Sequence, residues 1–411
     1  MKINIYSTKE KSGGAAIAAN RVNKAFNSNI SIDSLMIVGA IQSNPLAPKV
    51  KFQGNLLLMK FYHYIEKAIL KTQKTQNKIY HSLGLFGVLK SNEINSNYCD
   101  LVNIHWVNTC FISIFTLSKI KKPIIITLHD SWFFCGTEHH PLNESDFRYK
   151  NGYNSKNRNL NDRLIDLDKY IWKIKCFFLN KKIIFVAPST WLYNKAKESF
   201  ILKQNKVYHI PNPIDLNIYK PTNPLVNLPG NVDVLKKTLL FGAFGNPFED
   251  NKGGDLLLES LSVLKNENFQ CICVGQKGKD YKIGNIEIKF VGHISDELKM
   301  VELYCLADAV AIPSKIENLT QMGTEAFACG TPVVAFNVGG NSDIIDHSIN
   351  GYLATPFDTL DFANGVKKIL NLTKTESKEW KELCVKKAKK QWSFESVSNQ
   401  YLNIFKNSYE Q

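Results

Sequence analysis

Residues 313–334 read Pro-Ser-Lys-Ile-Glu-Asn-Leu-Thr-Gln-Met-Gly-Thr-Glu-Ala-Phe-Ala-Cys-Gly-Thr-Pro-Val-Val, and this stretch joins the end of an apolar strand to a polar loop and a helix. Asn318 and Thr320 are both suited to cap the helix, which we expect to run over residues 320–329. Gly330 follows at the position where many helices end in a left-handed residue. Because the helix begins at the carboxyl end of a strand, its N–H groups and its dipole can receive a phosphate.

Two carboxylates, Glu317 and Glu325, flank this phosphate-accepting turn. A carboxylate and a phosphate repel each other, so we expect both side chains to accept hydrogen bonds from neutral hydroxyls. Sugars and riboses offer such hydroxyls. The simpler alternative is a pair of surface glutamates that stabilise the helix dipole. The apolar run that follows and the position of the stretch in the second half of the chain favour a site for a phosphate-linked sugar.

Strands and helices alternate around this stretch. The second half of the chain has apolar segments typical of strands at residues 238–243, 270–274, 286–291 and 309–313, with helices expected at residues 254–265 and 295–307. The first half repeats the alternation, with strands expected at residues 3–6, 101–105, 124–128 and 183–188 and a helix at residues 15–26. This pattern predicts α/β units with parallel sheets.

Ligands of parallel sheets bind at the carboxyl ends of the strands. The first places to look in the first half are therefore the loops at residues 12–14, 105–108 and 129–140.

The chain of 411 residues exceeds what one hydrophobic core usually organises. Proline and asparagine are concentrated in residues 211–232, which we interpret as a linker between two domains. We predict an N-terminal Rossmann-like domain at residues 1–215 and a C-terminal Rossmann-like domain at residues 216–392, with their sheets facing a central cleft. A last helix at about residues 393–411 should pack back on the first domain.

Composition limits the partners. Hydrophobic residues make up 44% of the chain and charged residues 21%, as in ordinary globular proteins. Lys and Arg exceed Asp and Glu by 51 to 37, a net charge of +14 that suits phosphorylated substrates or an acidic membrane surface. No nucleic-acid-binding motif is present. The nine cysteines show no Cys-x-x-Cys pair, and no apolar run approaches the roughly 18 residues of a membrane span, so we expect a cytoplasmic protein with reduced thiols.

Residues 51–90 combine apolar positions at helical spacing with many lysines. The favoured interpretation is a helix pair that packs on the sheet, because amphipathicity is common to all packed helices. The alternative is a basic amphipathic helix on acidic lipid or on a lipid-linked acceptor.

The spacing of Glu317 and Glu325, with the Ala-Phe-Ala-Cys-Gly-Thr-Pro-Val-Val run after it, resembles retaining glycosyltransferases of family 4, which have the two-domain GT-B fold. The resemblance implies that Glu325 holds the ribose hydroxyls of a nucleotide-sugar donor and that Glu317 holds the donor sugar. The backbone N–H groups of Asn318, Leu319 and Thr320 would then meet the sugar and phosphate end of the donor.

Further segments resemble the same family in the same order. Lys252 and Gly253 match a Lys-Gly segment whose cation neutralises the donor diphosphate, whereas the Arg that the family usually places a few residues earlier is absent from residues 241–246. Either Lys252 acts with backbone N–H groups or another cation substitutes. Gly13 and Gly14 match the glycine loop after the first strand, which is equally suited to a plain turn. Two loops that resemble those around the nucleotide base contribute Gly275 and His293.

The segment from His129 to His140 resembles the His-Asp-x-Trp stretch of a bacterial polysaccharide-assembly branch of family 4. By this resemblance His129 faces the donor sugar, and Asp130 orients His129 or meets the acceptor. Trp132, His139 and His140 are further candidates on the acceptor side. A metal site made of His129, Cys135, His139 and His140 is the less favoured alternative, since adjacent histidines rarely face one ion.

The function that the resemblance implies is a metal-independent, retaining hexosyltransferase without a cofactor. Its donor would be a UDP- or GDP-sugar, and its acceptor an undecaprenyl-diphosphate-linked saccharide of O-antigen lipopolysaccharide, capsule or exopolysaccharide assembly. We expect the protein to be peripheral on the inner face of the bacterial inner membrane. Two other functions stay open: a sugar-nucleotide epimerase of the same fold, and a binding protein without catalysis.

Overall fold

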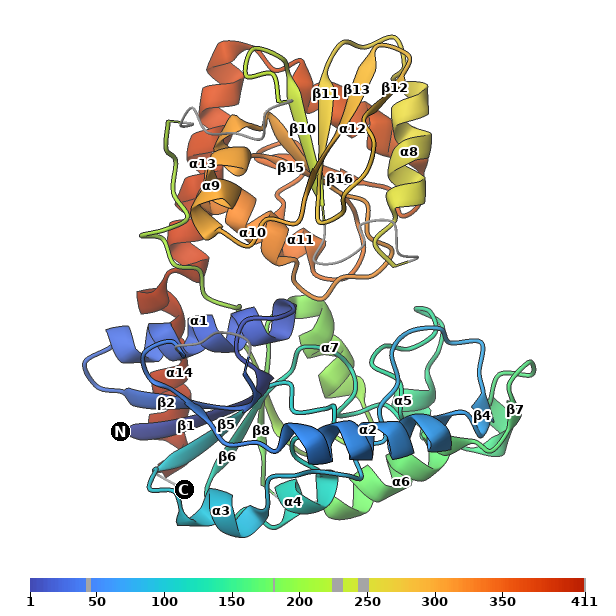
Figure 1. Cartoon of the computed structure of the whole chain (residues 1–411), viewed down its shortest axis with the longest axis vertical. Helices are drawn as coiled ribbons and strands as arrows, with labels where there is room; N and C mark the ends of the chain where they lie inside the picture. The colour runs from blue at the N-terminus through green and yellow to red at the C-terminus, as the bar shows by residue number, and fades with distance from the viewer. Residues whose placement is uncertain (42–45, 180–181, 224–231, 243–250, 410–411) are drawn as a thin grey trace. The chain divides into compact units, whose positions relative to one another are not determined.

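The chain forms two compact units (Figure 1). A computed structural model describes residues 1–41, 46–179, 182–223, 232–242 and 251–409. The first unit comprises Met1–Ile210 with Ser398–Gln411, and the second comprises Pro211–Val397. The sequence-based boundary between residues 215 and 216 lies close to this division. The prediction that the two sheets face a central cleft stays a prediction.

The first unit is built on a parallel sheet of seven strands in the order β3-β2-β1-β5-β6-β8-β9. Two short strands, β4 and β7, form a separate antiparallel pair. The elements of this unit are β1 (Lys2–Lys9), α1 (Gly14–Ser28), β2 (Asp33–Ala40), β3 (Val50–Phe52), α2 (Leu56–Leu70), β4 (Gln73–Lys74), α3 (Ser91–Ser96), β5 (Leu101–Ile104), α4 (Ile114–Ser118), β6 (Ile124–Thr127), α5 (Arg148–Asn151), the 3-10 helix η1 (Ser155–Asn157), β7 (Arg163–Leu164), α6 (Leu167–Phe178), β8 (Ile184–Ala187), α7 (Thr190–Glu198), β9 (Lys206–His209) and α14 (Phe394–Tyr409).

The second unit has a seven-stranded sheet in the order β12-β13-β11-β10-β14-β15-β16, parallel except for β12. Its elements are β10 (Thr238–Gly242), α8 (Gly254–Val263), β11 (Gln270–Val274), β12 (Tyr281–Ile283), β13 (Ile286–Gly292), α9 (Glu297–Leu306), β14 (Ala309–Ile312), α10 (Gln321–Ala328), β15 (Val333–Phe336), α11 (Asn341–Ile344), β16 (Gly351–Ala354), α12 (Thr359–Leu370) and α13 (Lys374–Trp392).

Both faces of the second sheet are covered, which explains why its strands are apolar throughout. Along β10, Leu239 and Phe241 enter the core under α8 and α12, and Leu240 enters the core under α9, α10 and α13. Successive side chains of a strand point to opposite faces, so a strand buried on both sides needs apolar residues at every position. The helices after β10 and β14 therefore lie on opposite faces of the sheet.

The last helix, α14, completes the first unit. The rings of Tyr401 and Phe405 pack edge-on against Phe26 of α1, with centroids 5.1 and 5.8 Å away. The hydroxyls of Tyr401 and Thr127 at the end of β6 lie within hydrogen-bonding distance, 2.9 Å apart. The chain from Ser398 onward therefore belongs structurally to the domain that the N-terminus begins.

The predicted fold class of two Rossmann-like α/β units is confirmed. Every strand and helix expected in the alternating segments is present, with ends shifted by a few residues. The helix pair expected over residues 51–90 is wrong, because only α2 forms there, and Met59 and Glu66 are its buried residues. None of the described helices is long and apolar enough to cross a membrane.

Candidate functional site

The strand order of the second unit switches sides at β10. β10 leads to β11 on one side, and its other neighbour is β14, which comes later in the chain. The helices after β10 and β14 cover opposite faces, and in open α/β sheets ligands bind in the crevice outside the carboxyl ends of the strands at such a switch in strand order. These two loops carry the predicted donor-site residues Lys252 and Glu317.

Gly253 brings the two loops together. It has a left-handed backbone with φ +68°, and a Cβ atom there would lie 1.9 Å from the carbonyl oxygen of Pro313. The backbone N–H of Lys315 also donates to the carbonyl of Asn251 across 2.9 Å. Only glycine permits both this conformation and this approach, so the Lys-Gly segment is fixed against the loop that follows β14.

Lys252 and Glu317 form an ion pair in this crevice. The Nζ atom of Lys252 lies 2.7 Å from Oε1 of Glu317, and the hydroxyl of Ser314 donates to the same oxygen across 3.0 Å. The side chains are 28% and 16% exposed, so both reach solvent. An anion entering from solvent can therefore compete with Glu317 for the lysine.

The loop after β15, the strand next to β14, contacts the backbone of Glu317. Gly339 has φ +57°, and a Cβ atom there would lie 1.7 Å from the carbonyl oxygen of Glu317. The N–H of Gly340 donates to that oxygen across 3.0 Å. Neither glycine was among the predicted site residues, although the Gly-Gly pair after the apolar run of residues 333–338 is a visible signal.

The helix α10 begins where the phosphate-accepting turn was expected. Thr320 is its N-cap residue, and the Thr320 side chain makes no capping hydrogen bond. Leu319 and Thr320 are both buried, so what they can offer a ligand is chiefly the backbone. At the other end Gly330 has φ +83°, as predicted from its place after the helix. Asn318, the other candidate cap, lies in the loop before the helix.

Glu325 lies within α10 and is held by a neighbouring helix. The hydroxyl of Tyr304 in α9 donates to Oε2 of Glu325 across 2.8 Å. Burial raises the pKa of Tyr304 well above its usual value, and so does the nearby carboxylate, so the phenol keeps its proton and remains a donor. Tyr304 was not found from the sequence, because nothing in its position along α9 indicates which face meets Glu325.

Two further predicted residues lie at the same edge of the sheet. Gly275 and Gly292 end β11 and β13 with positive φ angles, and the N–H of Gly275 donates to the carbonyl of Gly292 across 2.9 Å. His293 follows Gly292 and is exposed. Their proposed contact with a nucleotide base stays a prediction.

Residues 243–250 lie outside the described residues. They include most of the segment in which the expected Arg is absent from the sequence. In the described parts of the loops after β10 and β14, Lys315 is the other cation beside Lys252. Its Nζ atom lies 2.9 Å from Asp255 in the first turn of α8. Lys315 is thus the nearest candidate to substitute for the absent Arg.

In the first unit, the corresponding switch in strand order lies between β1 and β5. Gly13 follows β1 with φ +88° and caps α1, whose first residue is Gly14. A Cβ atom on Gly13 would meet nothing within 4 Å. The glycine is required by its backbone conformation, and the space beside it is open.

His129 takes part in a chain of buried hydrogen bonds. Nε2 of His129 lies 2.9 Å from Nδ1 of His105, and Nε2 of His105 lies 2.7 Å from Oδ1 of Asn103. Burial lowers the pKa of His105 well below its usual value and that of His129 to about 4. Both rings are therefore neutral at pH 7. If each Nε2 donates along this chain, Nδ1 of His129 is its acceptor nitrogen.

Asp130 pairs with His139, a partner that the sequence did not indicate. Oδ2 of Asp130 accepts from Nδ1 of His139 across 2.6 Å and from the indole N–H of Trp106 across 3.1 Å. Burial raises the pKa of Asp130, but the charge and hydrogen bond of His139 outweigh it and bring this pKa to about 2. The other nitrogen of His139 lies 2.6 Å from the hydroxyl of Ser82.

The rest of the His129–His140 segment surrounds a buried lysine that sequence reasoning missed. Lys175 of α6 donates to the carbonyls of Cys135 and Gly136 across 3.1 and 2.6 Å, and its Nζ atom lies 3.9 Å from the ring centre of Trp132. Burial lowers the pKa of Lys175 to about 7. Trp132 is only 2% exposed, and its indole N–H donates to the carbonyl of Ser82, which fits a packing role.

The alternative metal site finds no support among the described side chains. His129, Cys135, His139 and His140 do not form one of the groups in which three potential ligand atoms lie within 4.8 Å of one another. His139 is engaged with Asp130, and the ring of His140 lies near Trp191, with centroids 6.0 Å apart.

A solved structure with the same arrangement defines the class of fold. Anabaena Alr3699/HepE, in complex with UDP and glucose, aligns with a TM-score of 0.64 at 16% sequence identity, over 99% of this chain and 99% of that one. With two Rossmann-like units in one chain, this similarity shows the GT-B fold.

Sequence comparison then identifies the second unit. Residues 236–372, which lie in this unit, match the family described as Glycosyl transferases group 1. An uncharacterized glycosyltransferase of Methanocaldococcus jannaschii is 28% identical over 222 residues, which are 50% of this chain and 54% of that protein. Protein CapJ of Staphylococcus aureus is 30% identical over 179 residues, 41% and 43% of the two chains. The chain thus matches about half the length of these curated relatives.

Proposed function

We propose that this chain is a retaining hexosyltransferase that moves a sugar from a nucleotide-diphosphate sugar to a saccharide acceptor. The observation that carries the proposal is the Lys252–Glu317 pair at the crevice between β10 and β14, next to the start of α10. The group 1 domain spans the same residues. The structurally similar Anabaena protein was solved with UDP and glucose, so a UDP-sugar is the first donor to test, and a GDP-sugar the second.

In this proposal the diphosphate takes Lys252 away from Glu317. The lysine is partly exposed and its partner is a single carboxylate oxygen, so a doubly charged diphosphate offers a stronger attraction. The N-terminus of α10 adds backbone N–H groups and its dipole on the same side. Together they stabilise the charge that develops on the leaving phosphate, which is the electrostatic contribution that enzymes most often use.

The carboxylates then receive the neutral parts of the donor. Glu317, released by Lys252 and still held by Ser314, accepts hydroxyls of the donor sugar. Glu325, whose Oε2 accepts a hydrogen bond from Tyr304, accepts the ribose hydroxyls. Carboxylates near the anomeric carbon also favour its positive character in the transition state. The donor therefore meets a cation at its phosphates and acceptors at its hydroxyls.

The first unit supplies the acceptor side in this proposal. Because the pKa of His129 is about 4, the ring is neutral at pH 7 and acts as a hydrogen-bond acceptor for a sugar hydroxyl instead of a cation. The pair of Asp130 and His139 is the second polar group of this loop. His140 completes the set, whereas Trp132, a candidate from the sequence, is buried with its indole N–H engaged by Ser82.

No residue has to act as a covalent nucleophile. The leaving phosphate itself accepts the proton of the acceptor hydroxyl, and attack occurs on the face from which the phosphate departs, so that the anomeric configuration is retained. Lys252 and the helix start neutralise the diphosphate, which makes the transfer independent of a divalent metal and of any cofactor.

We assign the acceptor to bacterial surface polysaccharide assembly, as an undecaprenyl-diphosphate-linked saccharide at the inner face of the membrane. The similarity to Protein CapJ of Staphylococcus aureus and the net charge of +14 support this assignment. The outer face of α2 supports it further, because Leu57, Phe61 and Tyr64 are 80%, 58% and 76% exposed beside Lys60 and Lys67. Such a basic, apolar helix face suits an anionic lipid surface.

The test is transfer of radiolabelled sugar from UDP- and GDP-sugars, with and without a bacterial lipid extract. Product that forms only with the extract supports the proposal. Epimerised donor without transfer would instead support the epimerase, and donor binding without turnover a non-catalytic protein. Lys252→Ala should reduce transfer at least about 100-fold, since it removes a charge that acts in the transition state. Lys282→Ala, an exposed lysine of the same unit, is the matched control and should keep full activity.

A further inference from the structure

Among the described residues, two groups bring at least three potential metal-ligand atoms within 4.8 Å of one another: His63, Glu66 and Cys110, and His81, Glu138 and Asp168. Both groups belong to the first unit, whereas the predicted residues Lys252, Glu317 and Glu325 belong to the second. Neither was singled out from the sequence.

The side chains of the second group are engaged with other partners. Nδ1 of His81 lies 2.7 Å from the hydroxyl of Thr137, and its Nε2 lies 3.2 Å from the carbonyl of Asn77. Asp168 accepts from the side-chain amide of Gln73 across 2.8 Å. Because both nitrogens of His81 already have neighbours, this group is the weaker candidate for an ion.

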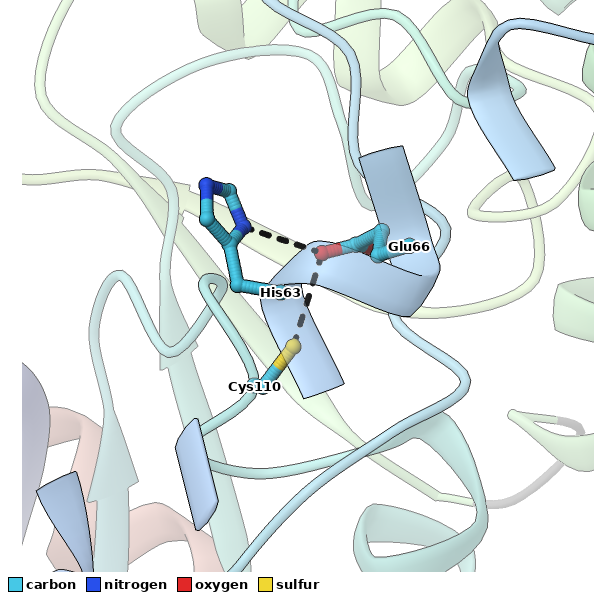
Figure 2. A group of neighbouring side chains, drawn as sticks. All are labelled: His63, Glu66 and Cys110. Carbon is cyan, nitrogen blue, oxygen red and sulfur yellow. Dashed lines mark hydrogen bonds and ion pairs between the residues drawn. The ribbon is translucent and has the colours of Figure 1, made fainter. Parts of the chain in front are cut away.

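The first group has a different composition, with one nitrogen, one oxygen and one sulfur ligand (Figure 2). His63 and Glu66 lie three residues apart on α2 and therefore on one face of the helix. Cys110 comes from the loop after β5. Figure 2 shows the imidazole of His63 and the thiol of Cys110 directed at the carboxylate of Glu66 from two sides.

Two of the three ligand–ligand distances are close to the edges of a tetrahedral zinc site, and all three atoms lie within 4.8 Å of one another. Nδ1 of His63 lies 3.7 Å from Oε2 of Glu66, and Sγ of Cys110 lies 3.5 Å from the same oxygen. Zinc bonds of about 2.0 Å to nitrogen and oxygen and about 2.3 Å to sulfur give tetrahedral edges of about 3.3 Å for N–O and about 3.5 Å for S–O. The group therefore needs only a small adjustment of His63 to surround an ion.

The surroundings of each ligand fit this geometry. The other carboxylate oxygen of Glu66 accepts the N–H groups of Leu83 and Gly84 across 2.5 and 3.2 Å, which fixes the carboxylate and directs Oε2 at the other two side chains. Nδ1 of His63 is buried and has no hydrogen-bond partner. Cys110 has a left-handed backbone with φ +64°, an uncommon conformation for a residue with a side chain.

We propose that His63, Glu66 and Cys110 bind one zinc ion, with water as the fourth ligand. The set of imidazole, carboxylate and thiolate suits zinc better than magnesium or calcium, which prefer oxygen ligands alone. The His63 side chain is 31% exposed, although its Nδ1 atom is buried. The ion would tie α2, whose buried residues are Met59 and Glu66, to the loop that also carries His105. It takes no part in sugar transfer.

Binding releases one proton. The thiol of Cys110 donates to Oε2 of Glu66 across 3.5 Å, so it carries its proton before an ion binds. When the Zn–S bond forms, the S–H bond breaks and the proton passes to solvent.

The test is zinc titration of the full-length protein, stripped with EDTA and kept reduced, in competition with a chromogenic chelator. We expect one zinc per chain, and a thiolate-to-metal charge-transfer band when Co²⁺ replaces zinc. His63→Gln and Cys110→Ser should each weaken binding by more than about 100-fold, since changes around a ligand alone cost up to that much. The band should also vanish in Cys110→Ser. A circular dichroism spectrum of each apo variant checks that it is folded.

Two variants serve as matched controls. Cys176→Ser removes a free thiol outside the proposed site, and Glu138→Gln replaces a carboxyl group of the second group by an amide. Both should keep one zinc per chain. Absence of stoichiometric zinc in the wild type, unchanged affinity in His63→Gln, which alters a partly exposed side chain, or loss of zinc in Glu138→Gln would each overturn the assignment.

Discussion

Replacement of Gly253 by alanine tests the geometry of the donor site most directly. The added Cβ atom would lie 1.9 Å from the carbonyl oxygen of Pro313, whereas real Cβ contacts essentially never fall below 3.0 Å, so the two loops must separate by about 1.1 Å. The left-handed backbone costs about 1–2 kcal/mol for alanine, and overpacking adds about 1–3 kcal/mol. The expected loss in free energy of unfolding is therefore about 2–5 kcal/mol.

The separation moves Lys252 relative to Glu317, and a misplacement of about 1 Å at a reacting centre costs roughly 100-fold in rate. Gly284→Ala is the matched control, because Gly284 has φ +58° and its Cβ would lie 2.1 Å from the carbonyl oxygen of Lys265, at the opposite edge of the same sheet. Both variants should lose similar stability in urea titrations. Only Gly253→Ala should lose about 100-fold in kcat/KM, measured below the melting temperature of both. Equal kcat/KM values in the two variants would refute the reasoning.

Two further predictions concern single side chains. Tyr304→Phe removes the hydroxyl that donates a hydrogen bond to Glu325, at a cost of about 1.5–3 kcal/mol. The KM for the nucleotide sugar should therefore rise about 10-fold or more with little change in kcat. An unchanged KM in steady-state kinetics would show that Glu325 does not bind the nucleotide sugar. The lowered pKa of His129, about 4 against 6.5, means that the unfolded chain binds a proton that the folded chain does not. This contribution to stability is complete above about pH 6.5 and is lost by up to about 3 kcal/mol as the pH falls to 4. Urea titrations across this range should show a smaller acid loss in His129→Gln than in the wild type, and identical slopes would contradict the assignment.

The strand–loop–helix at residues 313–334 could be predicted because each step has a local cause: an apolar strand, capping residues and a terminal glycine. The neighbours of that loop could not. Gly339 approaches Glu317 within van der Waals distance only because β15 pairs beside β14, and strand order is a tertiary property. In the same way, Tyr304 meets Glu325 only because α9 and α10 share a face of the sheet.

The pairing of Asp130 with His139 could not be predicted for the same reason. Sequence adjacency pointed to His129, but successive residues after a strand point in different directions. His129 turns to His105 at the end of β5, while Asp130 turns to His139 at the end of its own loop. The buried Lys175, which organises this loop through carbonyl groups, comes from α6 and leaves no trace in the loop sequence.

Each unit has one switch in strand order, and the side chains beside it differ in chemistry between the two units. In the second unit the crevice between β10 and β14 presents Lys252 beside the start of a helix, which suits an anion. In the first unit, burial lowers the pKa of His129, after β6, to about 4, which suits an uncharged hydroxyl. His105 positions His129, because both of its ring nitrogens are engaged with His129 and Asn103. In the proposed function, the charged diphosphate of the donor and the neutral hydroxyl of the acceptor correspond to these two different environments.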